Sequence, residues 1–458
     1  MTGPYDGLAV LVAGAGRSGV SAARALRAHG ALVTVAEAGE AQAQQVRDDG
    51  FAVVDGATLP DGTQLVVTSP GWRPDAPLLV RAAAAGLEVV GEVELAWRLS
   101  RLRPDPAPWL AVTGTNGKTT TVKMLEAVLQ AAGLSAVATG NVGLPVVDAV
   151  AAGHDVLAVE LSSFQLHWSS TVRPGVGAVL NVADDHTDWH GSFQEYALAK
   201  AKVLDAGTSI ANADDEVSRT LLNRARGQRV TFTLQAPRAG ELGVVEDLLV
   251  DRAFSHTASG DVPGEGTVLA STSDLTVHGP HNVANALAAG AMARAHGVPA
   301  SAVRDGLRAF RAEAHRNALV ATQAGVAWVD DSKATNPHAA AASLASYTSV
   351  VWVAGGLLKG ADVDDLVRVA APRLRAAVLL GTDRAVLAEA LARHAPQVPV
   401  VEVDRLDTGA MLDVVTAARR LAAPGDTVLL APAAASMDCF RDYAERGRLF
   451  AEAVRAGA

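Results

Sequence analysis

The chain has 458 residues, of which 49% are hydrophobic and 19% are charged. This balance is typical of well-packed globular domains and argues against a disordered protein, and the length favours about three domains. The formal net charge of −10 argues against general binding to nucleic acid or to anionic membranes. Cys439 is the only cysteine, so an intramolecular disulfide is impossible and a reducing, cytoplasmic compartment is expected. We expect neither a signal peptide nor a membrane-spanning segment.

The N-terminal residues predict a β-α-β unit that binds a nucleotide. Strand-like runs at 8–13 and 32–36 flank a helical stretch at 18–29. The segment from Gly14 to Gly19 fits the pattern G-x-G-x-x-G, and Glu37 lies at the end of the second strand. Such a turn exposes a helix N-terminus to a diphosphate, and the carboxylate can accept hydrogen bonds from ribose hydroxyls. Dinucleotides and nucleotide-sugars both satisfy these constraints, and the fingerprint alone favours a dinucleotide.

A second β-α unit opens at Trp109, after a segment at 101–108 whose three prolines indicate an interdomain linker. Its loop at 113–120 reads Thr-Gly-Thr-Asn-Gly-Lys-Thr-Thr. Gly114 and Gly117 allow a tight turn whose N–H groups converge on an anion, Lys118 adds a positive charge, and the hydroxyl of Thr119 suits magnesium. Only two residues separate the glycines, fewer than in the common phosphate loop, and an ordinary strand-to-helix turn is the alternative. We predict a phosphate cradle for ATP, which makes a nucleotide-sugar the preferred ligand of the N-terminal unit.

Polar residues follow two further candidate strands, at 156–159 and 176–180. Glu160 ends the first strand, and the run Asp184-Asp185-His186 follows the second. The carboxyl ends of parallel strands share one edge of a sheet, so we expect these groups near the phosphate loop, with Glu160 placed to hold magnesium. Taken singly, each is equally well a solvated loop residue or a helix cap. Lys200 falls in a helical pattern at 194–204, which by itself predicts a cation on a solvated helix face.

A less regular stretch at about 235–263 precedes a helical segment that follows His281. Asn282 and Asn285 are three residues apart and would share one helix face. An asparagine can pair with an adenine edge through its donor and acceptor together, although Asn282 as a simple N-terminal cap is a comparable interpretation.

A third β-α series is predicted from strands at 326–329, 350–354, 377–380 and 428–430. Asp331 and Lys333 follow the first of these strands, and Lys359 follows the second, so both lysines could face one carboxylate-binding crevice. The alternative for Lys359 is a flexible surface loop. The sequence therefore predicts an α/β protein with a Rossmann-like domain at 1–104, a P-loop ATPase-like parallel-sheet domain at 105–312 and a second Rossmann-like domain at 313–458.

Six motifs, in order along the chain, together resemble the Mur ligases. They are Thr-Gly-Thr-Asn-Gly-Lys-Thr at 113–119, Glu-Leu-Ser-Ser-Phe-Gln at 160–165, Asp-Asp-His at 184–186, His-Asn-x-x-Asn at 281–285, His-Arg at 315–316 and Asp-Ser-Lys-Ala-Thr-Asn at 331–336. The resemblance covers essentially the whole chain. The last motif is the most discriminating and is similar to that of the glutamate-adding members.

The resemblance implies an ATP-dependent, ADP-forming ligase of peptidoglycan precursor synthesis, and so a role in cell wall biogenesis, cell shape and cell division. The implied reaction joins D-glutamate to UDP-N-acetylmuramoyl-L-alanine through an acyl phosphate, in the cytoplasm, with ATP and two magnesium ions, and by a monomer. Another Mur-type or polyglutamate ligase of the same fold is the alternative within this class. A nicotinamide-dependent or nucleotide-sensing regulator that uses Gly14 to Gly19 without ligation is the alternative from another class.

The resemblance also implies roles for individual residues. It implies that the catalytic residues are Lys118, Glu160, His186 and Lys200. It implies that the metal ligands are Thr119, Glu160, His186 and Lys200. It also implies that Lys200 is carbamylated, because the pattern Tyr196-x-x-Ala199-Lys200 matches the modified lysine of the family. For ATP it implies Gly114, Thr115, Asn116, Gly117, Lys118, Thr119, Thr120, Asn282, Asn285, Arg316 and Asp331. For the UDP precursor it implies Arg17, Ser18, Glu37, Ser69, Gly71, Asn141 and Ser162. For D-glutamate it implies His186, Lys333, Thr335, Lys359, Ser436 and Tyr443. The chain departs from the family at Leu357-Leu358, where Asp-Gly is frequent, and at Tyr443, where phenylalanine also occurs.

Overall fold

The computed structural model of the chain describes residues 3–254, 266–277, 279–311 and 314–457. These residues form two compact units. Unit 1 runs to Leu275 and includes Ala284–Phe310, and unit 2 combines Thr276–Val283 with the residues from Arg311 onwards. Across the described ranges, no helix has both the length and the apolar character needed to cross a membrane.

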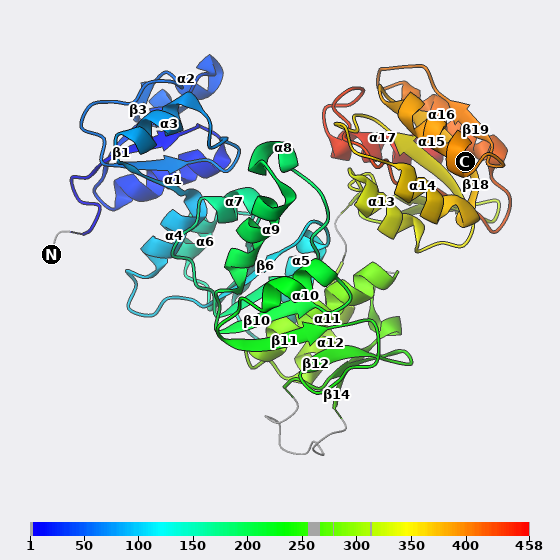
Figure 1. The fold of residues 1–458 in the computed structure, drawn as a ribbon, viewed down its shortest axis with the longest axis horizontal. Coiled ribbons are helices and arrows are strands. Elements are labelled where there is room, and N and C mark those ends of the chain that lie inside the picture. Colours follow the sequence, from blue (N-terminus) through cyan, green and yellow to red (C-terminus); the bar gives the residue numbers. More distant parts are fainter. Residues whose placement is uncertain (1–2, 255–265, 278, 312–313, 458) are drawn as a thin grey trace. The chain divides into compact units, whose positions relative to one another are not determined.

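The first sheet of unit 1 is wholly parallel, with strand order β3-β2-β1-β4-β5. It belongs to the N-terminal part of the chain, which is blue in Figure 1. Its strands are β1 (Ala9–Ala13), β2 (Leu32–Ala36), β3 (Ala52–Val54), β4 (Leu65–Thr68) and β5 (Glu88–Gly91), and its helices are α1 (Arg17–Ala28), α2 (Glu40–Asp48), α3 (Pro77–Ala84) and α4 (Glu92–Ser100). Along β1, Val10 and Val12 pack into one core cluster and Leu11 and Ala13 into another, so both faces of the sheet are covered. The turn after β1 lies where the strand order reverses, which is the usual ligand position in such sheets.

The second sheet of unit 1 has nine strands in the order β14-β13-β12-β11-β10-β9-β6-β8-β7. Its strands are β6 (Trp109–Thr113), β7 (Ala136–Gly140), β8 (Val156–Glu160), β9 (Val176–Val179), β10 (Thr208–Asn212), β11 (Gln228–Phe232), β12 (Glu241–Val245), β13 (Leu248–Asp251) and β14 (Thr267–Ser271). Its helices are α5 (Lys118–Ala131), α6 (Val146–Ala152), α7 (Ser163–His167), α8 (Thr187–His190), α9 (Phe193–Ala201), α10 (Glu216–Leu222), α11 (Pro280–Ala295) and α12 (Ala300–Ala309). Because β6 lies between β8 and β9 and is parallel to both, the loops that follow these three strands meet at one edge.

The prediction of an irregular stretch at 235–263 is wrong over its first half. Strands β12 and β13 form an antiparallel hairpin there, in which Leu242 pairs with Asp251 and Val245 with Leu248. The strands are short, and Gly240 and Gly243 interrupt the apolar pattern, so alternation along this segment is weak. Residues 255–263 lie outside the described ranges. The predicted strands at 8–13, 32–36, 156–159 and 176–180 are confirmed to within one residue at each end.

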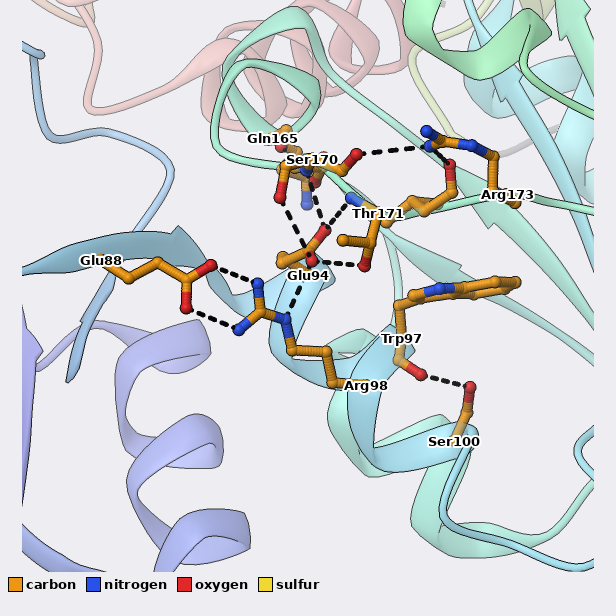
Figure 2. Close-up of polar contacts among 11 residues, drawn as sticks. Glu88, Glu94, Trp97, Arg98, Ser100, Gln165, Ser170, Thr171 and Arg173 are labelled. Carbon is orange, nitrogen blue, oxygen red and sulfur yellow. Dashed lines mark hydrogen bonds and ion pairs between the residues drawn. The ribbon is translucent and has the colours of Figure 1, made fainter. Parts of the chain in front are cut away.

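A buried carboxylate joins the two sheets of unit 1 (Figure 2). Glu94, on α4, is 0% exposed and accepts hydrogen bonds from the backbone N–H groups of Ser170 and Thr171, each at 2.9 Å. Arg98 Nε donates to the same carboxylate at 2.9 Å, while the other nitrogens of this guanidinium bind Glu88. Although burial opposes it, these hydrogen bonds keep the pKa of Glu94 below its ordinary value. Helix α4 is thus fixed to the segment after α7.

Unit 2 contains a six-stranded sheet in the order β15-β16-β20-β17-β18-β19, in which only β15 is antiparallel to its neighbour. Its strands are β15 (Ala318–Gln323), β16 (Val326–Asp330), β17 (Val350–Gly355), β18 (Leu374–Leu380), β19 (Val400–Glu402) and β20 (Thr427–Leu430), and its helices are α13 (Pro337–Leu344), α14 (Asp364–Ala370), α15 (Arg384–His394), α16 (Ala410–Leu421) and α17 (Tyr443–Ala456). Trp352 packs on one face of the sheet, and Val351 and Val353 pack on the other. Parallel strands β16, β20 and β17 are neighbours, so the loops at their carboxyl ends lie side by side.

Candidate active site

The loop between β6 and α5 has the geometry of an anion cradle. Gly117 immediately precedes the helix with φ of 82°, and an added Cβ would lie 2.4 Å from Asn285 Oδ1, so the position suits only glycine. An added Cβ on Gly114 would lie 3.1 Å from Asn116 O. The loop therefore follows a tight path into the N-terminus of α5, where free N–H groups and the helix dipole favour an anion.

Glu160 lies at the carboxyl end of β8 with its carboxylate directed at the cradle. Its side chain is almost fully buried, at 1% exposed. Thr119 Oγ1 donates to Glu160 Oε2 at 2.8 Å, and Asn141 Nδ2 donates to Glu160 Oε1 at 2.8 Å. The structure thus brings together the threonine and the glutamate that the sequence proposed as ligands of the first magnesium ion.

Two lysines converge on one carbonyl oxygen of the cradle. Lys118 Nζ donates to Gly114 O and Thr115 O, both at 2.8 Å, and Lys200 Nζ donates to Gly114 O at 2.8 Å. The helix pattern placed Lys200 on a solvated face, which is wrong, because the residue is 2% exposed and its ammonium lies 4.6 Å from the centre of the Tyr196 ring. Burial, and then the charge of Lys118, hold the pKa of Lys200 well below its ordinary value.

His186 lies in the loop after β9, in a left-handed conformation with φ of 55°. Its Nδ1 is 3.5 Å from Asp185 Oδ1, and its ring lies 4.8 Å from the ring of Phe164. The imidazole is therefore held against the first turn of α7, within unit 1 and one strand away from the cradle.

The turn after β1 is organised by Glu37. Its Oε2 accepts from Ala15 N at 2.7 Å and its Oε1 from Gly39 N at 2.8 Å, so this carboxylate fixes the glycine turn. Ser69 Oγ is buried without a hydrogen-bond partner and lies 3.0 Å from the position of a Cβ on Gly14. Arg17 and Gly71 are exposed, Ser18 is half-buried, and Ser162 Oγ caps α7 by accepting from Gln165 N.

The two asparagines of α11 are both buried, with Asn282 at 5% and Asn285 at 6% exposed. Asn285 Oδ1 accepts from Thr121 Oγ1 of α5 at 3.3 Å, which connects α11 to the helix of the cradle. The alternative of Asn282 as N-terminal cap is wrong, because α11 begins at Pro280 and Asn282 lies inside its first turn.

In unit 2, a strained turn at 315–317 precedes β15. His315 and Asn317 have φ of 65° and 52°, and Arg316 lies between them. His315 Nδ1 is 2.6 Å from Asp330 Oδ2, and this hydrogen bond raises the pKa of His315. Asn317 N donates to Asp331 Oδ1 at 3.1 Å. Burial raises the pKa of Asp331 to about 6, so the carboxylate is largely ionised at neutral pH.

The residues proposed for D-glutamate in unit 2 lie on the adjacent loops after β16, β17 and β20 and at the start of α17. Lys333 Nζ lies 3.8 Å from the centre of the Tyr443 ring, so the structure brings this pair together. Thr335 N donates to Lys333 O at 2.8 Å, and Ser436 is 3% exposed. Lys359 is exposed, with φ of 55°, on the loop after β17.

Comparison with known proteins identifies the family of the chain. Residues 112–293 match the family description "Mur ligase middle domain", and residues 315–434 match "Mur ligase, glutamate ligase domain". The chain is 61% identical to the UDP-N-acetylmuramoylalanine--D-glutamate ligase of Thermobifida fusca and 56% identical to that of Streptomyces avermitilis, each over 98% of both chains. The chain belongs to the Mur ligase family. A crystal structure of MurF from Acinetobacter baumannii has the same fold, with a TM-score of 0.62 and 19% identity over 93% of this chain and 91% of that one.

The Mur ligase motifs are braced by residues to which the sequence analysis gave no role. Asn181 Oδ1 accepts from Asn116 N at 2.9 Å, which fixes the cradle from the end of β9. The hydroxyl of Tyr196 lies 2.9 Å from Thr115 Oγ1. Asn181 follows a strand, and Tyr196 precedes Lys200 by one helical turn. These positions place both residues near the cradle, but the motifs alone did not predict their contacts.

The Mur ligase cradle contains few protein ligands for a metal. Among the residues that the structure describes, no group of three or more histidine, cysteine, aspartate or glutamate side chains could hold a metal ion. Thr119 and Glu160 supply two hard oxygen groups at the N-terminus of α5. Two such groups would suit a magnesium ion whose remaining ligands come from phosphate oxygens and water.

Proposed function

We propose that this Mur ligase joins D-glutamate to UDP-N-acetylmuramoyl-L-alanine in an ATP-dependent, ADP-forming reaction of peptidoglycan precursor synthesis. Two contacts together carry the proposal. Thr119 and Glu160 are in contact at the cradle, and Lys333 and Tyr443 are in contact in the glutamate ligase domain. The two relatives named above carry the name of this activity over the full chain. We further propose the domain bounds 1–104, 105–312 and 313–458, a monomer, and a cytoplasmic location.

The reaction begins with the activation of a carboxylate. An oxygen of the alanyl carboxylate attacks the γ-phosphorus of ATP and ADP leaves, which gives an acyl phosphate. The two reactants are anions, so Lys118 and the N-terminus of α5 offset their repulsion at the point where they meet. The remaining ATP contacts are proposed at Thr120, Asn282, Asn285, Arg316 and Asp331.

The amine of D-glutamate then attacks the acyl carbon. The tetrahedral intermediate collapses and expels phosphate, and the amine loses its protons to solvent or to a neighbouring base. Lys333, Thr335, Lys359, Ser436 and Tyr443 are proposed to bind D-glutamate, together with His186. The positive side chains of the two lysines suit the two carboxylates of D-glutamate. Both lysines lie on loops that follow strands of one sheet, which gives them a fixed geometry.

Magnesium fits the residues at the cradle. The Glu160 carboxylate and the Thr119 hydroxyl are buried oxygen groups 2.8 Å apart at the N-terminus of α5. When bound, magnesium supplies neutralisation of phosphate charge. We propose a second ion at His186 and Lys200, for which Lys200 must first become an anion.

The environment of Lys200 supports its carbamylation. Only an uncharged amine reacts with carbon dioxide, and burial together with the nearby charge of Lys118 lowers the pKa of Lys200, which favours that form. A carbamate would replace this buried amine beside Lys118 by an anion. The two lysines would then attract each other across the Gly114 carbonyl oxygen.

In the N-terminal domain, the uridine diphosphate group is proposed to bind at the glycine turn after β1. Arg17 and Ser18 open α1 at this turn, and Glu37 and Ser69 flank it. Gly71, Asn141 and Ser162 complete the proposed set. A nucleotide-sugar supplies the diphosphate and the ribose that this geometry suits.

An acceptor panel tests the proposed function. The protein is incubated with ATP, magnesium and UDP-N-acetylmuramoyl-L-alanine, with D-glutamate, L-glutamate, glycine or L-lysine as acceptor, and phosphate release and product mass are measured. We expect ligation with D-glutamate. Absence of product and of phosphate release in a preparation that binds ATP would overturn the proposal. Preference for another amine would favour another Mur-type or polyglutamate ligase, and tight NAD binding without ATP turnover would favour a regulator.

A further inference from the structure

Arg446, a buried arginine of unit 2, has none of the roles assigned above. It lies in the first turn of α17 and is 0% exposed. A guanidinium carries five N–H donors and a charge, so its burial is costly unless acceptors surround it. Burial lowers the pKa of Arg446 to about 10, which leaves the group positively charged at neutral pH. A positive charge at a fully buried position indicates a specific structural or functional role.

Arg446 hydrogen-bonds three separate loops. Its Nε donates to Ser332 Oγ at 2.9 Å and its Nη2 to Ser332 O at 2.9 Å. Its Nη1 donates to Ala434 O at 3.1 Å and to Gly355 O at 3.4 Å. Ser332 follows β16, Ala434 follows β20, and Gly355 ends β17, and these are three neighbouring strands. One planar side chain therefore sets the spacing between the loops at the carboxyl edge of the sheet.

These loops carry the residues proposed for D-glutamate. Along the three loops, the sequence places Lys333 after Ser332, Ser436 after Ala434, and Lys359 after Gly355. Ser332 Oγ also donates to the carbonyl oxygen of Tyr443 at 2.8 Å, so the start of α17 belongs to the same network. Arg446 is thus bonded to the three loops that carry Lys333, Ser436 and Lys359, and it is linked to Tyr443 through Ser332.

The backbone around Arg446 is strained and needs support. Lys359 and Ala433 have φ of 55° and 60°, values that non-glycine residues keep only where surrounding contacts hold them. Leu357 N donates to Ala435 O at 2.8 Å and Ala435 N to Leu357 O at 2.9 Å, which links two of the loops directly. The guanidinium joins this pair to the third loop.

We propose that Arg446 is a positioning residue for the acceptor: it fixes the three loops at the spacing that D-glutamate requires, and so acts on D-glutamate binding through the backbone. This inference rests on the proposed function. The phosphate cradle lies in unit 1, and Arg446 bonds to Ser332 rather than to Asp331, the neighbouring residue proposed for ATP. The loss of Arg446 should therefore affect D-glutamate binding more strongly than ATP binding.

The test compares three variants of the full-length protein. Arg446→Met keeps an unbranched apolar stem and removes every donor. Arg446→Lys keeps the charge and loses the planar set of donors, and Arg419→Met is the matched control. Arg419 donates to Val454 O and Gly457 O at the opposite end of α17. For each folded variant, KM and kcat are measured with D-glutamate and with ATP as the varied substrate.

We expect Arg446→Met to raise the KM for D-glutamate at least about tenfold, because small displacements of binding groups are costly, and to change the KM for ATP less than about twofold. Arg446→Lys should give a smaller rise, and Arg419→Met none. An unchanged KM for D-glutamate in folded Arg446→Met, or equal rises in both KM values, would overturn the inference, because a merely structural role lowers the active fraction without separating the substrates.

If Arg446→Met does not fold, Ser332→Ala decides the matter. It removes the hydroxyl that joins Arg446 Nε to Tyr443 O, and we expect a rise in the KM for D-glutamate of about threefold or more. No rise would overturn the inference. Failure of the wild-type protein to use D-glutamate would instead overturn the proposed function, so the two failures are distinguishable.

Discussion

The substitution Glu160→Gln should separate stability from activity. The two hydrogen bonds to the carboxylate, from Thr119 and Asn141, are each 2.8 Å long, and loss of the charge weakens each by about 1 to 1.5 kcal/mol. Against this loss of roughly 2 to 3 kcal/mol, the variant no longer buries a carboxylate, whose desolvation costs several kcal/mol. The free energy of unfolding should therefore change by less than about 2 kcal/mol.

Activity should respond very differently to this change. Glu160 is the carboxylate proposed to hold magnesium at the cradle, and its loss should remove roughly 4 kcal/mol of transition-state stabilisation, or about a thousandfold in kcat/KM. Unfolding in urea without magnesium and phosphate release with saturating magnesium measure the two effects. Glu126→Gln is the control, since this half-buried carboxylate of α5 accepts from Ala138 N at 2.8 Å and from Lys123 Nζ at 2.9 Å. A kcat/KM for Glu160→Gln within tenfold of the wild-type value would refute the reasoning.

Three further predictions concern the other charged groups. Lys118→Ala should abolish phosphate release and retain the thermal unfolding transition, because the ammonium of Lys118 is proposed to contact the transferred phosphoryl group. Lys123→Ala, on the same helix, should retain turnover, and equal activities of the two variants would contradict the role of Lys118. Burial lowers the folded pKa of Lys200, so unfolding takes up a proton at pH values between the folded pKa and about 10.5. The stability of the bicarbonate-free wild type relative to Lys200→Met should therefore rise with pH towards about 10.5, by at most about 1.4 kcal/mol per pH unit. A constant difference in urea unfolding would contradict burial as an amine. Glu37→Gln should raise the KM for the UDP precursor about tenfold and leave the KM for ATP unchanged, because one of the two backbone N–H groups that Glu37 binds loses its acceptor. Equal effects on both substrates would count against the assigned ligand.

Local sequence predicted those parts of the site that depend on backbone geometry. The glycine turn after β1, the cradle after β6 and the polar ends of β8, β9 and β16 follow from strand patterns and from positions that suit only glycine, such as Gly117 with its φ of 82°. Parallel strands bring their carboxyl ends to one edge, and so Glu160 meets Thr119 although 41 residues separate them.

Contacts between segments that are distant in the sequence could not be predicted from local sequence patterns. Lys200 belongs to a helix rich in alanine, with no clear apolar stripe, and its burial depends on the Gly114 carbonyl oxygen, 86 residues away. Arg446 looks like an ordinary surface cation in sequence, and its partners come from three loops that only the strand order β16-β20-β17 brings together. Glu94 is a similar case, because its partners are 76 and 77 residues away.

The central claim is that the cradle directs a γ-phosphoryl group onto a substrate carboxylate. It is tested most directly with UDP-N-acetylmuramoyl-L-alanine labelled with ¹⁸O in the alanyl carboxylate, in the presence of ATP, magnesium and D-glutamate. Activation as an acyl phosphate predicts that one ¹⁸O atom appears in the released phosphate for each ligation event. Phosphate free of ¹⁸O, with both labelled oxygens recovered in unligated precursor, would show that the phosphoryl group passes to water and would contradict the account.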